Sequence, residues 1–248
     1  MSLPRALVVR SGANPFVSIA GSARLEIVER SSHSIEPVAP DESELGEPAD
    51  IVIFTSQVAV ERLFEDPRLA ALFRKAAERA RVVAVGPVTS EALAARSVEA
   101  DLVAGGSTES TLERLASDLA GQRVLLPCGE DASPDLQERL ASRGARVARL
   151  VLYRKIARPR DTELEREILE RPFGAFCATS PSAARWLFSG LPETAADRLR
   201  KTPAVVLGPF TRRFLEAHGV ARVEVTGEAR FAAAVVLLES LAAGAGAA

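Results

Sequence analysis

Aromatic, cysteine and histidine residues are scarce in this chain of 248 residues. It has one Trp, one Tyr and ten Phe, so Ala, Val and Leu must build most of the core, as in helices packed on parallel sheets. The two cysteines, Cys128 and Cys177, form neither a disulfide framework nor a metal-ligand spacing. Two histidines, His33 and His218, are too few for a histidine-based metal site. These shortages argue against metal and disulfide chemistry.

An excess of one charge and a long apolar run are lacking as well. The chain carries 31 Lys and Arg against 33 Asp and Glu, which argues against an electrostatic nucleic-acid binder. No apolar run approaches the roughly 18 residues of a membrane span. The first residues, MSLPRALVVRSG, lack the features of a signal peptide. We therefore expect a soluble cytoplasmic protein with neither a nucleic-acid nor a membrane partner.

Short β-branched runs alternate with segments at helical spacing, and the length suits two domains. This alternation predicts an α/β fold with mostly parallel sheets. The expected strands are 6–9, 25–28, 51–54, 82–85, 101–103, 124–126, 147–152, 174–177, 204–207 and 223–225. The expected helices are 58–64, 90–95, 111–119, 136–143, 182–188, 211–217 and 232–241.

An internal repeat organises these elements. IVIFTSQVAVERLF, which holds Ser56, aligns with AFCATSPSAARWLF, which holds Ser180. Downstream, VVAVGPVTSEAL aligns with AVVLGPFTRRFL. Ser56 and Thr89 are 33 residues apart, and Ser180 and Thr211 are 31 apart. More weakly, RALVVRSG near the start resembles RVLLPCGE in the middle of the chain. Two ordered motifs at nearly equal separation indicate a duplicated chain.

Two domain arrangements fit this repeat. In a tandem arrangement the boundary lies near residue 121. In a swapped arrangement, residues 38–154 form a domain inserted into an outer domain made of 1–35 and 158–248. The connecting segments, 35–47 and 154–162, are polar and contain Pro, as linkers do, whereas the stretch near 121 is too short to separate domains. This favours the swapped arrangement.

Hydroxyl side chains follow two expected strands where each gives way to a helix, at Thr55-Ser56 and at Ser180-Pro181-Ser182. Ser and Thr cap helices by satisfying free backbone N–H groups. Such a helix start also binds anions, because its N–H groups and dipole point at the ligand. Ligands of open α/β sheets lie beyond the carboxyl ends of the strands. The motif fits either simple capping or a ligand site.

The motif Gly-Pro-x-Thr begins two further helices and includes Gly86 with Thr89 and Gly208 with Thr211. Glycine allows a tight turn and close approach of a ligand, and proline suits the first helical position. The threonine then lies in the first helical turn. A helix start explains each copy alone, but repetition in both halves favours paired sites that face one cleft.

Other candidates are weaker. Tyr153, the only tyrosine, ends an apolar run, where it would either donate a hydrogen bond to a ligand or pack its ring and leave its hydroxyl wet. Cys128 and Gly129 follow a strand, where they would form another backbone N–H site or serve only packing. Ser107 precedes a helix, where it would help to bind a carboxylate or merely cap. Arg10 ends the first strand, where it could meet an anion.

The ordered set FTSxxAV, VGPxT, LPCGE, VLYRK, TSPSA and LGPFT resembles the uroporphyrinogen-III synthase family over roughly residues 50–240. The first 45 residues match mainly by position. The resemblance implies two similar open parallel-sheet α/β domains joined by a two-stranded linker, with the outer one built from both chain ends. It therefore selects the swapped arrangement.

The resemblance also implies a lyase of porphyrin and heme biosynthesis that uses no cofactor and no metal. Such an enzyme removes water from the linear tetrapyrrole hydroxymethylbilane, which bears acetate and propionate arms, and closes it to uroporphyrinogen III with inversion of the last pyrrole. A monomer that receives its substrate from the enzyme making it is implied too. Two alternatives stay open: a non-catalytic module of this fold that senses a tetrapyrrole or carboxylate, and a two-domain sugar or phosphate binder.

By the matching motifs, Tyr153 resembles the family tyrosine that assists the leaving hydroxyl. Thr89 and Thr211 match cleft threonines, and Ser56 and Ser180 match cleft serines. Phe210 departs from the pattern, because a second Thr is common at its position.

Overall fold

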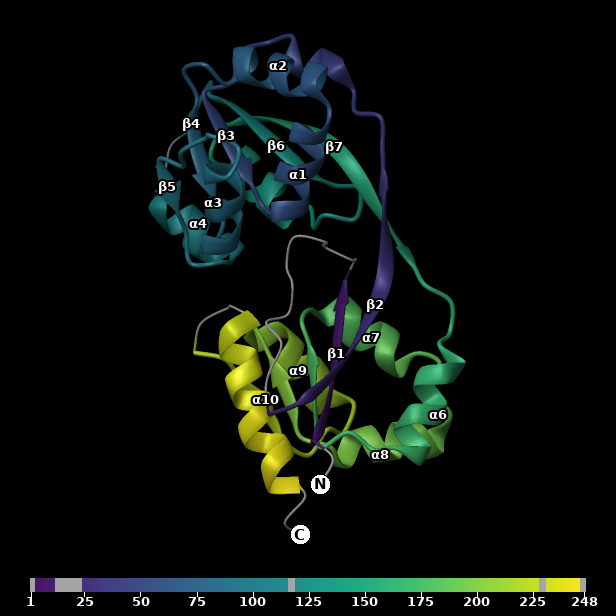
Figure 1. Ribbon diagram of the computed structural model, residues 1–248. Coiled ribbons are helices and arrows are strands. Elements are labelled where there is room, and N and C mark those ends of the chain that lie inside the picture. Colours follow the sequence, from purple (N-terminus) through teal and green to yellow (C-terminus); the bar gives the residue numbers. More distant parts are fainter. Residues whose placement is uncertain (1–2, 12–23, 116–118, 228–230, 246–248) are drawn as a thin grey trace. The chain divides into compact units, whose positions relative to one another are not determined.

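The computed structural model describes residues 3–11, 24–115, 119–227 and 231–245. The chain divides into two compact units (Figure 1): unit 1 is Met1–Ile35 with Ile156–Ala248, and unit 2 is Glu36–Lys155. In both units the strand pairs are parallel, and helices connect successive strands from β3 onward. The predicted α/β class with mostly parallel sheets is thereby confirmed.

Unit 2 holds the strand order β7-β6-β3-β4-β5. Its strands are β3 (Ile51–Phe54), β4 (Arg81–Ala84), β5 (Leu102–Val103), β6 (Arg123–Gly129) and β7 (Arg146–Ala157). Its helices are the short 3-10 helix η1 (Glu42–Leu45), α1 (Gln57–Glu65), α2 (Pro67–Ala76), α3 (Pro87–Ala94), α4 (Thr108–Arg114) and α5 (Asp135–Ala141). Ile53 faces α4 and α5, whereas Phe54 meets Phe73 of α2, so helices cover both faces.

Unit 1 repeats this plan with the strand order β10-β9-β8-β1-β2. Its strands are β1 (Arg5–Ser11), β2 (Glu26–Pro37), β8 (Ala175–Ala178), β9 (Ala204–Val206) and β10 (Val223–Val225). Its helices are α6 (Thr162–Glu170), α7 (Pro181–Phe188), α8 (Glu193–Lys201), α9 (Pro209–Ala217) and α10 (Phe231–Ala245). One face packs on α10 through Ala6, Val8 and Leu238, and the other face packs on α6 to α9.

The internal repeat extends to the pairing of single residues. In unit 1, Arg5 pairs with Glu26 and each following pair advances by one, until a shift before Ser11 pairs it with His33. In unit 2, the pairing of β6 with β7 advances in the same way and shifts at the corresponding point, where Gly129 pairs with Tyr153. The duplication therefore preserves strand register and even the irregularity at the strand ends.

Sequence patterns placed the strands better than the helices. Each expected strand is present, but β2 was predicted to end at residue 28 and continues to Pro37, because its polar, half-exposed second half shows no apolar alternation. The charged helices α2, α6 and α8 were missed. The helix expected at 111–119 ends at Arg114, and its residues 116–118 lie outside the described part of the chain. The expected linkers are also partly strand, since β7 runs to Ala157.

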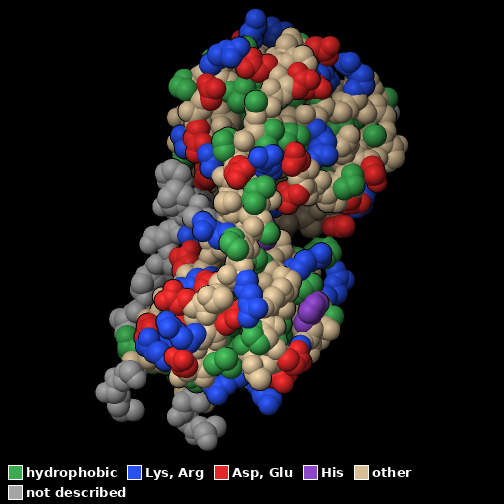
Figure 2. All heavy atoms as spheres, turned by 90° about the vertical axis from the view of Figure 1, so that its right-hand side faces the viewer, with side chains coloured by type: hydrophobic (Ala, Val, Ile, Leu, Met, Phe, Trp, Pro, Cys, Tyr) green, Lys and Arg blue, Asp and Glu red, His purple; other side chains and the backbone are tan. Residues whose placement is uncertain are grey.

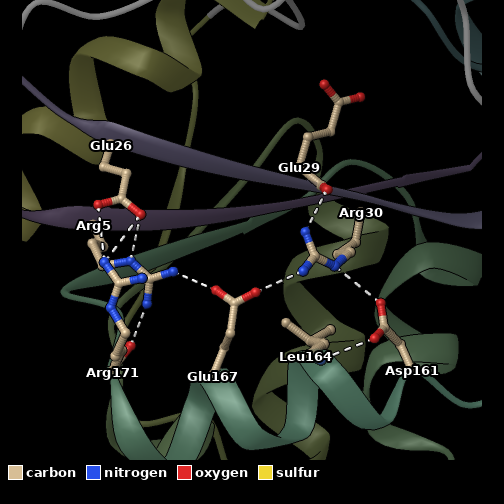
Figure 3. A network of polar contacts seen from close by, with 8 residues as sticks. All are labelled: Arg5, Glu26, Glu29, Arg30, Asp161, Leu164, Glu167 and Arg171. Atoms are coloured by element: carbon tan, nitrogen blue, oxygen red, sulfur yellow. Dashed lines mark hydrogen bonds and ion pairs between the residues drawn. The ribbon is translucent and has the colours of Figure 1, made fainter.

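A polar network around the buried Arg5 holds α6 against β1 and β2 in unit 1 (Figure 3). The Arg5 side chain is paired with Glu26 at 2.9 Å and with Glu167 of α6. Arg30 of β2 binds Glu167 at 2.7 Å and Asp161, the residue that caps α6, at 3.0 Å. Glu167 thus joins two strands to one helix, and the buried guanidinium of Arg5 is compensated by carboxylates, as a buried charge must be.

Unit 2 has the same device at the matching residue. Arg123, which begins β6 as Arg5 begins β1, is buried and binds Glu44 at 2.9 Å and Glu47 at 3.4 Å. In each unit an arginine at the start of a strand binds the helix that follows the long connecting strand: Arg5 binds α6, which follows β7, and Arg123 binds η1, which follows β2. The repeat therefore includes these two arginine anchors.

Candidate functional site

The carboxyl ends of β3 and β4 in unit 2 lead directly into helix starts. Ser56 caps α1, and its Oγ accepts the N–H of Ala59 at 3.2 Å. Gly86 caps α3 and Pro87 is its first helical residue, so no capping side chain covers the first-turn N–H groups of α3. Uncovered N–H groups at a helix start attract anions.

Tyr153 lies at the same edge and is linked to the first of these helix starts. Its Oη is 3.1 Å from Ser56 Oγ, and the residue is only 4 % exposed. Burial raises the pKa of the Tyr153 phenol, while the hydrogen bond with Ser56 acts in the opposite direction. The phenol therefore keeps its proton at neutral pH, and that proton is the one a donor role requires.

Gly129 makes room for this ring. A Cβ at Gly129 would lie 2.8 Å from both Cε2 and Cζ of Tyr153, a distance that real Cβ atoms do not tolerate. The neighbouring Glu130 N–H donates to the Tyr153 carbonyl at 2.8 Å. The sequence predicted a strand end with available N–H groups at Cys128 and Gly129. The strand was expected to end at residue 126, but β6 continues through Gly129 and Cys128 is buried in it, as the packing alternative expects.

A second loop lies beside the start of α3. Ser107 caps α4 and forms a reciprocal pair of hydrogen bonds with Ser110. A Cβ on Gly86 would lie 3.4 Å from the Cα of Gly106, and the N–H of Gly106 donates to the Val85 carbonyl at 2.7 Å. The glycines let the two loops approach closely, so Ser107 belongs to the same edge as Gly86.

Unit 1 carries a different group of hydroxyls at the equivalent edge. Ser11 Oγ lies 2.9 Å from Ser180 Oγ and 2.8 Å from Ser182 Oγ, and the last two lie 3.0 Å apart. Ser180 also caps α7, where Pro181 is the first helical residue. Ser11 was not singled out from the sequence. Its alignment with Gly129 in the repeat was the available signal.

The Gly-Pro-x-Thr helix of unit 1 matches that of unit 2. Gly208 begins α9 without a side-chain cap, as Gly86 begins α3. Thr89 is 6 % exposed and Thr211 is 3 % exposed, so each threonine is held mostly inside its unit. The groups of this motif that a ligand can reach are therefore the backbone N–H groups of the helix start, more than the threonine hydroxyl.

Other predicted residues differ in what surrounds them. Arg10 forms an ion pair with Glu29 on β2, so its charge is already balanced within unit 1. Thr55, beside Ser56, is exposed. Thr226, at the end of β10, was missed from the sequence; its buried hydroxyl has no hydrogen-bond partner among the described residues.

The groove along β2 and α6 is a poorer candidate. Arg5, Arg30 and Arg171, which line it, are each paired with a carboxylate (Figure 3). On the face shown in Figure 2, basic and acidic side chains are interspersed. Within the described ranges, no three His, Cys, Asp or Glu residues gather as metal ligands. Of the helices in those ranges, none combines the length and apolarity needed to cross a membrane.

Fold and site together define an α/β protein of two similar parallel-sheet units, each with hydroxyls and uncapped helix starts at its carboxyl edge. The family model for Uroporphyrinogen-III synthase HemD matches residues 17–235. A putative uroporphyrinogen-III synthase from Methanothermobacter thermautotrophicus is 31% identical over 212 residues, which cover 80% of this chain and 79% of that protein. The chain therefore belongs to the uroporphyrinogen-III synthase family.

Solved structures agree on the fold. A mutant uroporphyrinogen III synthase from the extremely thermophilic bacterium Thermus thermophilus superposes with a TM-score of 0.62 at 23% identity and 96% coverage of both chains. Uroporphyrinogen-III synthetase from Helicobacter pylori gives a TM-score of 0.61 at 17% identity, with 96% of this chain and 99% of the other covered. The sequence-based resemblance is confirmed.

Proposed function

We propose that this protein is an active uroporphyrinogen-III synthase, a lyase that dehydrates hydroxymethylbilane and closes it to uroporphyrinogen III with the last pyrrole inverted. Family membership implies this substrate. The observation that carries the proposal is the hydrogen bond between Tyr153 and Ser56, at the same sheet edge as the uncapped start of α3.

The carboxylate arms of the substrate match the groups at these edges. The first-turn N–H groups of α3 and α9 carry no side-chain cap, so each helix start can bind one carboxylate without a basic side chain. Each hydroxyl among Ser11, Ser180 and Ser182 can turn its proton toward a carboxylate at the cost of one internal hydrogen bond. A near-neutral protein can in this way hold a polyanion. We propose the carboxyl edges of both units as substrate-binding surfaces.

The chemistry needs one proton delivered and one removed. The hydroxyl of the hydroxymethyl group leaves as water after accepting a proton, and the electron pair of a pyrrole nitrogen helps to break the C–O bond. The freed methylene is attacked by the carbon of the last pyrrole that already bears a bridge, which gives a spiro intermediate. The old bridge bond then breaks, the bridge carbon bonds to the free α-carbon of the same pyrrole, and that carbon loses a proton to restore the ring, which is now inverted. We assign the delivery to Tyr153, whose phenol is protonated at neutral pH because burial raises its pKa.

Position matters more than acid strength in this reaction, because the open chain also closes without an enzyme. The protein has to hold the last pyrrole so that the correct carbon is attacked, and such orientation effects supply much of many enzymatic accelerations. We further propose that units 1 and 2 are the two domains. We also propose that the protein acts as a monomer supplied by the enzyme that makes hydroxymethylbilane.

The test supplies freshly made hydroxymethylbilane to the purified protein, oxidises the products and separates the porphyrin isomers. The expected result is isomer III formed faster than the spontaneous reaction. Formation of isomer I alone, at the rate seen without protein, would contradict the proposal.

A further inference from the structure

An aromatic side chain is exposed to solvent at the start of α9. Phe210 is the second residue of α9, two residues after Gly208, and is 58 % exposed. Burying an aromatic side chain stabilises a fold, and the exposed Phe210 contributes little of that stabilisation. Single exposed apolar residues are common, however, and exposure alone assigns no role.

A cation accompanies the ring. The guanidinium carbon of Arg213, one turn further along α9, lies 4.6 Å from the centroid of the Phe210 ring. Arg213 makes no ion pair or hydrogen bond with the described residues, whereas its neighbour Arg212 is paired with Glu216. Phe210 and Arg213 therefore present an apolar ring and an unneutralised positive charge side by side.

The repeat provides an internal comparison. Gly208-Pro209 begins α9 as Gly86-Pro87 begins α3, so Phe210 matches Val88 and Arg213 matches Glu91. The backbone is the same in both helix starts, and both second residues are exposed. Unit 1 nevertheless carries a ring and a cation where unit 2 carries an aliphatic side chain and an anion. Starting a helix accounts for the Gly-Pro pair that both units share. It does not account for the ring and cation in unit 1 against the aliphatic side chain and anion in unit 2.

We propose that Phe210 and Arg213 form a specificity-determining subsite that binds one pyrrole of hydroxymethylbilane together with a carboxylate arm; this inference rests on the function proposed above. The phenyl ring packs against the pyrrole ring, an arrangement that aromatic pairs favour. Arg213 binds the arm, since a guanidinium matches a carboxylate with two parallel N–H···O bonds. The matching position on α3 is Glu91, which offers the arm no cation. The subsite thus orients the substrate by making the two helix starts unequal.

The test compares Phe210→Ala and Arg213→Gln with the matched controls Val88→Ala and Glu91→Gln. Because all four side chains are exposed, we expect unchanged thermal unfolding. Loss of the ring or the cation should raise KM for hydroxymethylbilane roughly five- to twentyfold while kcat stays within about twofold. The controls should stay within about twofold in both constants. Phe210→Tyr should recover most of the affinity, and Arg213→Lys only part of it, because lysine keeps the charge but not the paired N–H donors. A purely structural role predicts neither recovery.

A binding measurement separates this inference from the proposed function. Uroporphyrin III, the stable oxidised product, carries the same arms, and its affinity can be followed by its own fluorescence. Weaker binding by Phe210→Ala and Arg213→Gln than by the controls supports the subsite even if the wild-type protein forms only isomer I. If wild-type protein forms isomer III while both variants bind and turn over like the controls, the subsite is refuted and the enzyme remains.

Discussion

The hydroxyl oxygens of Tyr153 and Ser56 lie 3.1 Å apart, although the two residues are 97 positions apart in the sequence. Only folding of the unit brings this pair together. Tyr153→Phe keeps the ring in place and removes the proton donor. We expect kcat to fall roughly tenfold, less than the about 10²–10⁴-fold of a strong general acid, because the pyrrole nitrogen does much of the expulsion. Steady-state rates with hydroxymethylbilane measure this. Full activity would remove Tyr153 from the donor role.

Gly129→Ala tests the position of the Tyr153 ring and leaves its hydroxyl in place. The phenol is retained, but the new Cβ would meet the ring at 2.8 Å and push it away from Ser56. We expect kcat to fall as in Tyr153→Phe, with a loss of about 1–3 kcal/mol in the free energy of unfolding from overpacking. Gly121→Ala is a control in which the Cβ meets nothing within 4 Å, so that only its positive φ of 76° is strained. Wild-type kcat in Gly129→Ala would show that the position of the ring is unimportant.

Cys177 gives a prediction about alkaline stability. Burial raises the pKa of the Cys177 thiol from 9.0 to about 12. Because the folded pKa lies above the unfolded one, the stabilisation is complete below pH 9 and is lost as pH rises from 9 towards 12. The decline is about 1.4 kcal/mol per pH unit for one such group. Urea unfolding at about pH 8 and about pH 11 should show a steeper loss for wild-type protein than for Cys177→Ala; equal losses would contradict it.

At the scale of elements, Glu167 is the residue that joins α6 to two strands (Figure 3). Glu167→Gln removes the charge shared by Arg5 and Arg30, and we expect about 1–3 kcal/mol less stability in unit 1. The only tryptophan, Trp186 on α7, reports unit 1 by its fluorescence during urea unfolding. Glu170→Gln, an exposed change of the same kind on the same helix, is the control. A transition at the same urea concentration in both variants would show that the network contributes nothing.

Elements also show what the sequence could and could not predict. β3 and β10 were predicted with their observed bounds, because buried strands of parallel sheets are short apolar runs. Helices α6 and α8 were missed because their charged residues outnumber the apolar ones that face the core. The serines at the helix starts were predictable, since capping is local. The partnership of Tyr153 with Ser56 and Gly129 depends on strand register, which no local pattern specifies.

At the scale of the whole molecule, unit 2 is one continuous stretch whereas unit 1 is made of two. We expect residues 36–155, expressed alone, to fold and to unfold cooperatively by far-ultraviolet circular dichroism. The reason is that β3 to β6, all of β7 except its last two residues, and the covering helices lie within this stretch. Residues 156–248 are the contrasting fragment. They lack β1, which pairs with both β2 and β8, and should stay unfolded. An unfolded 36–155 fragment would contradict the assignment of unit 2 as a domain.

The split of unit 1 bears on how the protein is made. A ribosome releases β1 and β2 first, yet β8 and the helices that cover β1 follow only after all of unit 2. At about 5–20 residues per second, the nascent N-terminal strands wait many seconds with apolar Ala6–Val9 uncovered, while unit 2 can fold during synthesis. We therefore expect the early strands to need protection from aggregation, by chaperones or by the low concentration of nascent chains, until the last third of the polypeptide emerges.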